Sequence, residues 1–255
     1  MAISLSDHFT YQKLLRFVAP SIFMMIITSI YSIVDGFFVS NFVGKNPFAA
    51  LNLIFPVIMA LAAFGFMIGT GGSALIAKKL GEGKQKEANE IFSMLVVALA
   101  VGGAALSGVC LLFLRPISYA VGATDLTIDD CLLYGSVLLA SLPFFMLQNS
   151  FQSFLATAEK PHFGLRVTVC AGLTNMALDF LLVYVFPLGL LGAALATAFS
   201  QLVGALIPLV YFLRPNDSPL RLTRPRFDLR ALARACGNGS SEMVSNLSTS
   251  LVGVL

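Results

Sequence analysis

Three acidic residues stand inside long apolar stretches of this sequence: Asp35, Asp179 and Glu242. A carboxylate deep in a membrane is costly unless it is paired, binds a cation or takes up a proton. We therefore hypothesise that an acidic residue inside a membrane span belongs to a functional site. The alternative is an acid at a helix end that reaches water, and this applies most to Glu242, which lies near the start of its stretch.

Asp179 belongs to a stripe of small and polar residues at helical spacing. Thr168, Gly172, Asn175 and Asp179 follow one another at i, i+4, i+7 and i+11. At 100° per residue, these positions fall on one face of a helix. The other positions of this stretch are mostly apolar, so the stripe marks a distinct face.

Two further stretches carry similar stripes, namely Ala193, Thr197, Ser200 and Gly204 in one and Thr28, Ser32 and Asp35 in the other. Small residues at this spacing also form the ordinary packing face of membrane helices. That alternative explains glycine, alanine, serine and threonine, but not aspartate or asparagine. Hard cations prefer oxygen ligands, so carboxylates, an amide and a hydroxyl could bind Na⁺. Poorly solvated carboxylates close together could carry a proton instead.

Further polar groups and a proline lie in the same stretches. Gln148, Asn149 and Gln152 form a polar patch that either makes hydrogen bonds between helices or lines a cavity. Pro20 removes one helical hydrogen bond, so it could kink the helix and act as a hinge. A proline in the first turn of a helix would cost little, and this second interpretation stays open.

The composition shows which elements must position these residues. Of 255 residues 57% are hydrophobic and 11% charged, with a mean hydropathy of +0.86. Such a chain is neither disordered nor a typical water-soluble enzyme. We expect an all-α membrane protein, because the apolar runs are continuous and lack the ten-residue alternation of barrel strands. The runs lie at 17–42, 49–76, 91–114, 131–156, 167–186 and 190–213, and the short apolar run of a seventh begins near 236.

The positive charges predict the orientation. Fourteen of the 16 lysines and arginines lie in the N-terminal tail and the second, fourth and sixth loops, and two lie in the first and third loops. Cytoplasmic loops carry the excess of basic residues, so we expect a cytoplasmic N-terminus and a multi-pass protein of the plasma or inner membrane. The seventh run is too short to span a bilayer, so we expect this sequence to be the first part of a longer protein.

The sixth loop, residues 214–234, is rich in proline and arginine and ends in a possible surface helix, Asp228 to Ala235. We interpret it as a cytoplasmic linker; binding of lipid headgroups or nucleic acid is the alternative, and the overall charge does not suggest a nucleic-acid surface. The four cysteines form no CxxC motif. No loop carries a Ser/His/Asp or HExxH motif, so we predict no enzyme, no cofactor and no metal site beyond possible Na⁺.

Three separated segments resemble the multidrug and toxic compound extrusion (MATE) transporters. The segment from Tyr31 to Ser40 resembles the first helix of that family, and the segment from Gly72 to Gly83 is similar to a characteristic family sequence. Asn175 to Asp179 and Leu191 to Thr197 look like its fifth and sixth helices. The resemblance covers essentially the whole chain and is closest to the bacterial subgroup of DNA-damage-inducible and staphylococcal pumps.

The resemblance implies one six-helix lobe of a twelve-helix transporter. Residues 1–213 would form the N-terminal lobe, 214–234 the linker between lobes, and 235–255 the start of helix 7. The missing second lobe would complete an antiporter that exports organic cations and amphipathic drugs, driven by Na⁺ or H⁺.

The resemblance also implies roles for individual residues. Asp35, Asn175, Asp179 and Thr197 match the cation-site positions of the N-terminal lobe, with Thr197 placed by spacing alone. Glu242 matches a variable acidic position of helix 7, and Pro20 matches a proline linked to bending in some members.

Two other function classes stay open. A flippase for lipid-linked oligosaccharides, from the same superfamily, would be expected to line its cavity with several arginines or lysines. A membrane enzyme or channel would need a water-facing catalytic motif or repeated pore-lining segments.

Overall fold

The computed structural model describes residues 11–254, and among them the side chains of all but residues 12–17, 32, 253 and 254. Six long helices form the body: α1 (Tyr11–Phe38), α2 (Lys45–Gly81), α3 (Gln85–Leu112), α5 (Ile128–Thr157), α6 (Pro161–Asp179) and α7 (Gly189–Leu213). Shorter pieces are α4 (Leu114–Ala120), α8 (Leu229–Asn238), α9 (Ser240–Val254) and two π-helical turns, η1 (Val39–Val43) and η2 (Phe180–Val185). The described residues contain no strand, which confirms the all-α prediction.

Each of the six predicted apolar runs coincides with one long helix. Six helices in the described chain are long and apolar enough to cross a membrane, from Val18–Val43 to Gly189–Leu213. Four of them, α1, α2, α3 and α6, extend several residues beyond the apolar run. A helix can continue into water because its backbone hydrogen bonds are satisfied internally, so the run defines the span and not the helix end.

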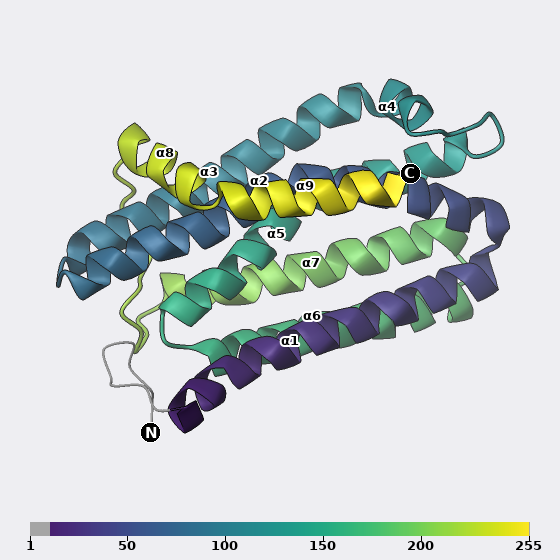
Figure 1. Cartoon of the computed structure of the whole chain (residues 1–255). Coiled ribbons are helices and arrows are strands. Elements are labelled where there is room, and N and C mark those ends of the chain that lie inside the picture. The colour runs from purple at the N-terminus through teal and green to yellow at the C-terminus, as the bar shows by residue number, and fades with distance from the viewer. Residues whose placement is uncertain (1–10, 255) are drawn as a thin grey trace.

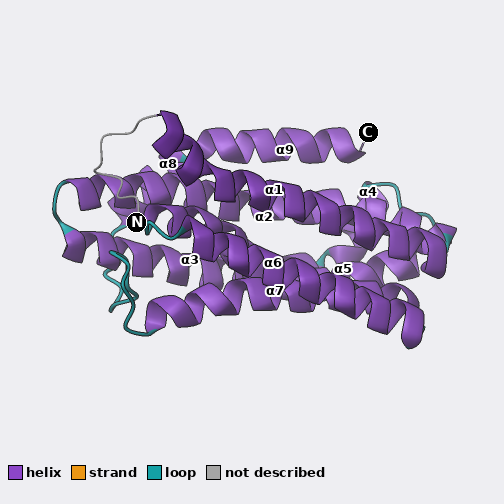
Figure 2. Ribbon diagram, turned by 90° about the horizontal axis from the view of Figure 1, so that it is seen from below, coloured by secondary structure: helices purple, strands orange, loops and turns teal. Residues whose placement is uncertain are grey.

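The helices run side by side, with α5 in the middle of the bundle (Figures 1 and 2). Helix α5 packs against α2, α3 and α7, while α1 packs mainly against α6. Small residues let the backbones approach closely. A Cβ on Gly69 would lie 2.8 Å from the Ser150 Cα, and a Cβ on Gly204 would lie 2.6 Å from the Gln148 Cδ. These glycines therefore lie on the faces through which α2 and α7 pack closely against α5.

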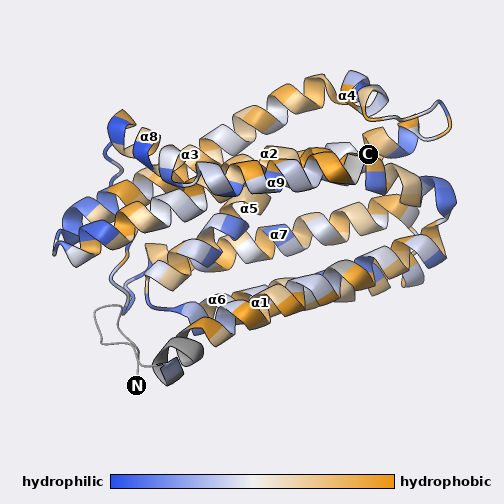
Figure 3. Cartoon of the chain, in the orientation of Figure 1, coloured by the Kyte–Doolittle hydropathy of each residue, from blue (hydrophilic) through white to orange (hydrophobic). Residues whose placement is uncertain are grey.

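Hydrophilic residues gather at the two ends of the bundle (Figure 3). At one end, the α2–α3 turn carries the ion pairs Lys79–Glu87, 2.7 Å, and Lys84–Glu82, 3.0 Å. The hydrogen bond with Lys84 holds the pKa of Glu82 below its usual range. The α5–α6 turn and the linker after α7 lie at this same end, as the charge pattern requires of alternating loops.

The linker after α7 is attached to α3 along a line of polar residues. Gln85 donates to the Pro219 carbonyl, 3.0 Å, and the Arg221 and Thr223 amides donate to Asn89 and Ser93, 3.1 and 2.8 Å. Gln85, Asn89 and Ser93 follow one another at i, i+4 and i+8 and so share one face of the helix. These hydrogen bonds hold the linker against α3, and we call it the docked linker below.

The predicted surface helix exists and differs in its bounds. The Asp228 carboxylate accepts hydrogen bonds from the amides of Arg230 and Ala231, 2.9 and 3.3 Å, so Asp228 is the N-cap and α8 begins at Leu229. The next helix, α9, begins at Ser240 instead of near 236, because α8 ends at Asn238 and Gly239 separates the two helices.

Candidate functional site

Two long helices bring the predicted acids Asp35 and Asp179 together. Helix α1 lies along α6, and the contact is close because Gly172 has no side chain: a Cβ there would lie 3.2 Å from the Tyr31 ring. Asp35 stands one turn beyond Tyr31, and Asp179 stands two turns beyond Gly172. The two carboxyl groups are close enough to share a hydrogen bond when one of them carries a proton.

The oxygen atoms of this cluster are buried without protein partners. Asp179 is 0% exposed and Asn175 is 1% exposed. Within the described residues, no hydrogen bond reaches the Asp35 Oδ1, the Asn175 Oδ1 or either carboxylate oxygen of Asp179. Buried polar atoms are costly unless they are satisfied. The arrangement can therefore hold a proton or a small cation, either of which would satisfy several of these oxygens at once.

Tyr134 is a third neighbour that the sequence analysis did not identify. It comes from α5, is 1% exposed, and lies near enough to both Asp35 and Asp179 to feel their charge. No spacing rule links residue 134 to residues 35 and 179, because the three belong to different helices. Only the packing of α5 against α6 reveals it.

Thr197 lies on α7, which packs along α6. It is half-buried, and its carbonyl accepts a hydrogen bond from the Ser200 hydroxyl, 2.8 Å. No hydrogen bond in the described part of the chain joins Thr197 to the two carboxylates. Its predicted role stays a prediction. The predicted partner Ser32 in the α1 stripe lies outside the described side chains.

Glu242 lies apart from this cluster. It sits in the first turn of α9, is exposed to solvent, and accepts a hydrogen bond from Asn246, 3.3 Å. Helix α9 packs mainly against α2, whereas Asp35 and Asp179 lie at the α1–α6 contact. This chain therefore does not place Glu242 with the predicted cation site.

The polar patch of α5 divides into two parts. Gln148 and Gln152 line a small internal cavity of about 10 Å³ beside Thr168 and Gly204, and the Gln148 Oε1 has no hydrogen-bond partner in the described chain. A cavity of this volume holds about one water molecule. Asn149 instead donates to the Phe145 carbonyl of its own helix, 2.9 Å.

Pro20 lies inside α1, nine residues after its first described residue, and α1 continues past it. The interpretation as a first-turn proline is wrong for this reason. A proline at an interior position lacks one backbone hydrogen bond, so this is where α1 can bend most easily.

Both acid-bearing helices widen into π-helical turns beyond their acids. Asp35 precedes η1 by four residues, and Asp179 is followed at once by η2. The two turns touch each other, and the Phe42 and Tyr184 rings meet edge to face with centroids 5.4 Å apart. Such turns occur frequently at functional sites.

Together, the six membrane-length helices and the buried acid pair define a polytopic α-helical membrane protein with a polar site inside its bundle. The sequence profile of the MatE family matches residues 20–181, and the chain belongs to this family of transporters. The resemblance identified from the sequence segments is thereby confirmed, and the chain is part of a protein of this transporter family.

Individual relatives agree with this assignment. The multidrug export protein MepA of Staphylococcus saprophyticus is 25% identical over 212 residues, covering 81% of this chain and 46% of MepA. An outward-facing multidrug resistance MATE family transporter of the MOP superfamily superposes with a TM-score of 0.86 and 24% identity, covering 93% of this chain and 53% of that one. A MOP superfamily transporter from Pyrococcus furiosus gives the same values. The chain thus spans about half the length of the relatives it matches.

Proposed function

We propose that the complete protein carrying this chain is a cation-coupled exporter of organic cations and amphipathic drugs. The proposal depends on one observation: Asp35 and Asp179 place buried, unpartnered carboxylate oxygens side by side on two adjacent helices. The similarity to MepA, a multidrug export protein, supports the choice of cargo.

The chemistry of the site supports coupling to Na⁺ or H⁺. Moving one elementary charge through the membrane potential supplies about 2.3 kcal/mol per 100 mV. A cation that binds between Asp35 and Asp179 removes the repulsion between the two carboxylates and satisfies their oxygen atoms. The packing of α1 against α6 therefore differs between the cation-bound and the cation-free protein. This difference can couple ion entry to a change in which side of the membrane the drug path faces.

The membership in a family of membrane transporters and the six membrane-length helices support the location as well. We propose that the protein lies in the plasma or inner membrane with the arginine-rich end in the cytoplasm. The second lobe would supply the other wall of the drug path, and no nucleic acid is involved.

The deciding experiment is transport by the full-length protein in sealed vesicles. A Na⁺ gradient and a pH gradient are imposed separately, and efflux of a fluorescent organic cation is followed. Efflux driven by either gradient supports the proposal and names the coupling ion. Movement of a lipid-linked sugar without any gradient dependence would favour the flippase instead. None of the six apolar runs contains a lysine or an arginine, so the spans of this chain lack the basic side chains expected to line the cavity of a flippase.

A further inference from the structure

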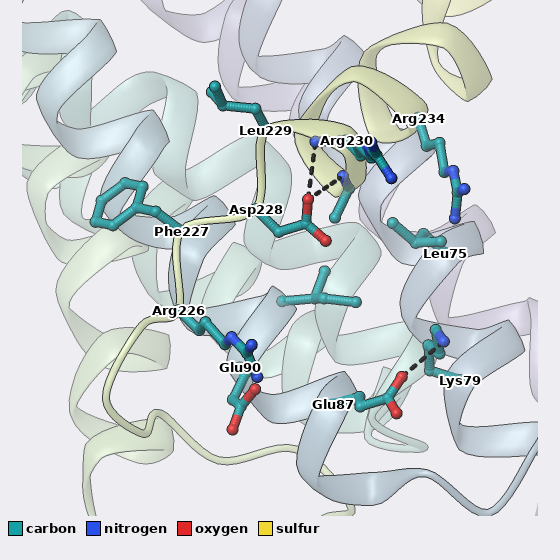
Figure 4. Close-up of a pocket in the computed structure, with 12 residues that line it drawn as sticks. Leu75, Lys79, Glu87, Glu90, Arg226, Phe227, Asp228, Leu229, Arg230 and Arg234 are labelled. Atoms are coloured by element: carbon teal, nitrogen blue, oxygen red, sulfur yellow. Dashed lines mark hydrogen bonds and ion pairs between the residues drawn. The ribbon is translucent and has the colours of Figure 1, made fainter.

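A cavity of about 710 Å³ lies where the linker and α8 meet the ends of α2 and α3 (Figure 4). Its basic lining consists of Lys79, Arg226, Arg230 and Arg234, and its acidic lining consists of Glu87, Glu90 and Asp228. This cavity is distant in the sequence from the buried acid pair and is not used by the proposed transport chemistry.

Most of the acids around this cavity already have partners. Glu87 is paired with Lys79 at 2.7 Å, and the Asp228 carboxylate caps the amides of Arg230 and Ala231. Glu90 is the remaining carboxylate.

The arginines are different. In the described structure, no carboxylate lies within 4.0 Å of the guanidinium groups of Arg226, Arg230 or Arg234. Arg230 and Arg234 follow one another at i, i+4 and lie side by side above Leu75 (Figure 4). The cavity therefore offers three unpaired guanidinium groups against one uncommitted acid, and guanidinium groups bind phosphate through paired hydrogen bonds.

Two large apolar side chains alternate with these arginines. Phe227 is 71% exposed and Leu229 is 79% exposed; both are among the residues that line the cavity, and their side chains extend away from the Lys79–Glu87 pair (Figure 4). A loop that faced only water would gain nothing from exposing a phenylalanine and a leucine next to arginines. Basic and apolar residues mixed in this way are typical of segments that lie in the headgroup region of a membrane.

The depth of the cavity agrees with this interpretation. Leu75 and Ile91 line the cavity and lie at the ends of the apolar runs 49–76 and 91–114, while Lys79 and Glu87 lie three and four residues outside these runs. The lining thus stands where two spans leave the apolar layer, which is the level of the lipid phosphates.

We propose that this cavity binds the phosphate headgroup of an anionic phospholipid, with Arg226, Arg230 and Arg234 on the phosphate and Phe227 and Leu229 in the adjoining acyl boundary. The lipid would fasten the docked linker to the membrane surface at the junction with the second lobe. A free phosphate could use the same arginines, but it would leave Phe227 and Leu229 without a role, and for this reason the lipid is the occupant.

The test titrates the purified full-length protein in detergent with phosphatidylglycerol and measures the bound lipid by native mass spectrometry. The variant Arg230→Gln with Arg234→Gln removes two charges from the cavity. Arg214→Gln with Arg224→Gln removes two charges from the same linker outside it and is the matched control. Each basic residue at a membrane surface contributes roughly fivefold, so the cavity variant should bind about 25-fold more weakly and the control less than twofold.

A second variant distinguishes the two sources of phosphate. Phe227→Ser with Leu229→Ser changes only exposed residues and should lower phosphatidylglycerol binding several-fold. Inorganic phosphate, added at the same concentration, should fail to displace the lipid from the unchanged protein. Equal lipid binding by the cavity and control variants would overturn the proposal. Ready displacement by inorganic phosphate, or full lipid binding by the Phe227 and Leu229 variant, would show a free-phosphate site and overturn it too. Neither result would affect gradient-driven efflux, which tests the proposed function.

Discussion

At the scale of residues, the acid pair differs from the threonines of the same bundle. Thr168 donates to the Gly164 carbonyl, 3.2 Å, and Thr174 donates to the Cys170 carbonyl, 2.8 Å, so these hydroxyls are satisfied within their own helix. A carboxylate has no proton to donate when ionised and cannot do the same. Asp35 and Asp179 therefore stay dependent on a proton or a cation from outside the protein.

This dependence leads to a prediction for the full-length transporter. Asp35→Asn and Asp179→Asn should each reduce gradient-driven efflux to near background while the protein still inserts. An amide keeps the shape of the side chain, but it cannot exchange a proton and binds Na⁺ weakly. Efflux is measured in vesicles at matched protein amounts.

Asn175→Ala and Thr197→Ala serve as graded comparisons. They remove a neutral ligand, so we expect a partial loss of efflux, smaller than that of the acid variants. A purely structural acid would give the reverse pattern, with poor insertion but unchanged efflux per inserted molecule. Normal efflux by Asp35→Asn would exclude this residue from the site.

At the scale of elements, the contact of α8 and α9 with α2 depends on two glycines. A Cβ on Gly71 would collide with the Ala235 carbonyl oxygen, and a Cβ on Gly239 would collide with the Met67 carbonyl oxygen. These neighbours are backbone atoms, which cannot rotate away as a side chain can. The start of the seventh helix can reach α2 only because both positions lack a side chain.

Gly71→Ala should therefore destabilise the full-length protein by about 1–3 kcal/mol, the usual cost of overpacking. The matched control is Gly102→Ala in α3, where a Cβ would meet nothing within 4 Å. Alanine there should be neutral or stabilising, since glycine weakens a helix. Thermal unfolding in detergent compares the two variants. Equal melting temperatures would mean that α8 and α9 do not rest on α2 in the complete protein.

The attachment of the linker to α3 gives another prediction at this scale. Asn89→Ala with Ser93→Ala removes the acceptors of the Arg221 and Thr223 amides. Each hydrogen bond contributes about 1 kcal/mol, so the linker should detach more often and trypsin should cut at its arginines roughly tenfold faster or more.

Asn52→Ala is the control for this experiment. Its amide group donates to the Phe48 carbonyl of its own helix, 2.9 Å, at a position away from the linker. Trypsin should cut this variant at the rate of the unchanged protein. If trypsin cut the unchanged protein as rapidly as the Asn89→Ala with Ser93→Ala variant, the linker would not be held by α3.

At the scale of the whole molecule, the alternation of loops between the two ends predicts which loops face the cytoplasm. A single cysteine at Lys84 should react with a membrane-impermeant thiol reagent from the cytoplasmic side alone, and one at Asp125 from the outside alone. The background must lack Cys170, which is exposed. Labelling in whole cells and in inverted vesicles measures this, and reversed labelling would contradict the orientation derived from the basic residues.

The sequence by itself determined the helices and their number in this lobe. Hydropathy acts locally: a run such as 190–213 must form a helix in a membrane, because no water is present to satisfy its backbone. The family resemblance likewise rested on short segments, such as Asn175 to Asp179, and the profile match confirms it. Helical periodicity was enough to place Asn175 and Asp179 on one face.

Contacts between helices were decided by the tertiary structure alone. The position of Tyr134 near the acid pair depends on how α5 packs against α6, and many side chains set that packing together. The same holds for the linker: the spacing of Gln85, Asn89 and Ser93 shows a polar face, but only the fold shows residues 219–223 lying on it. Periodicity describes one helix at a time, whereas a site is made by several, and their relative placement is a property of the whole core.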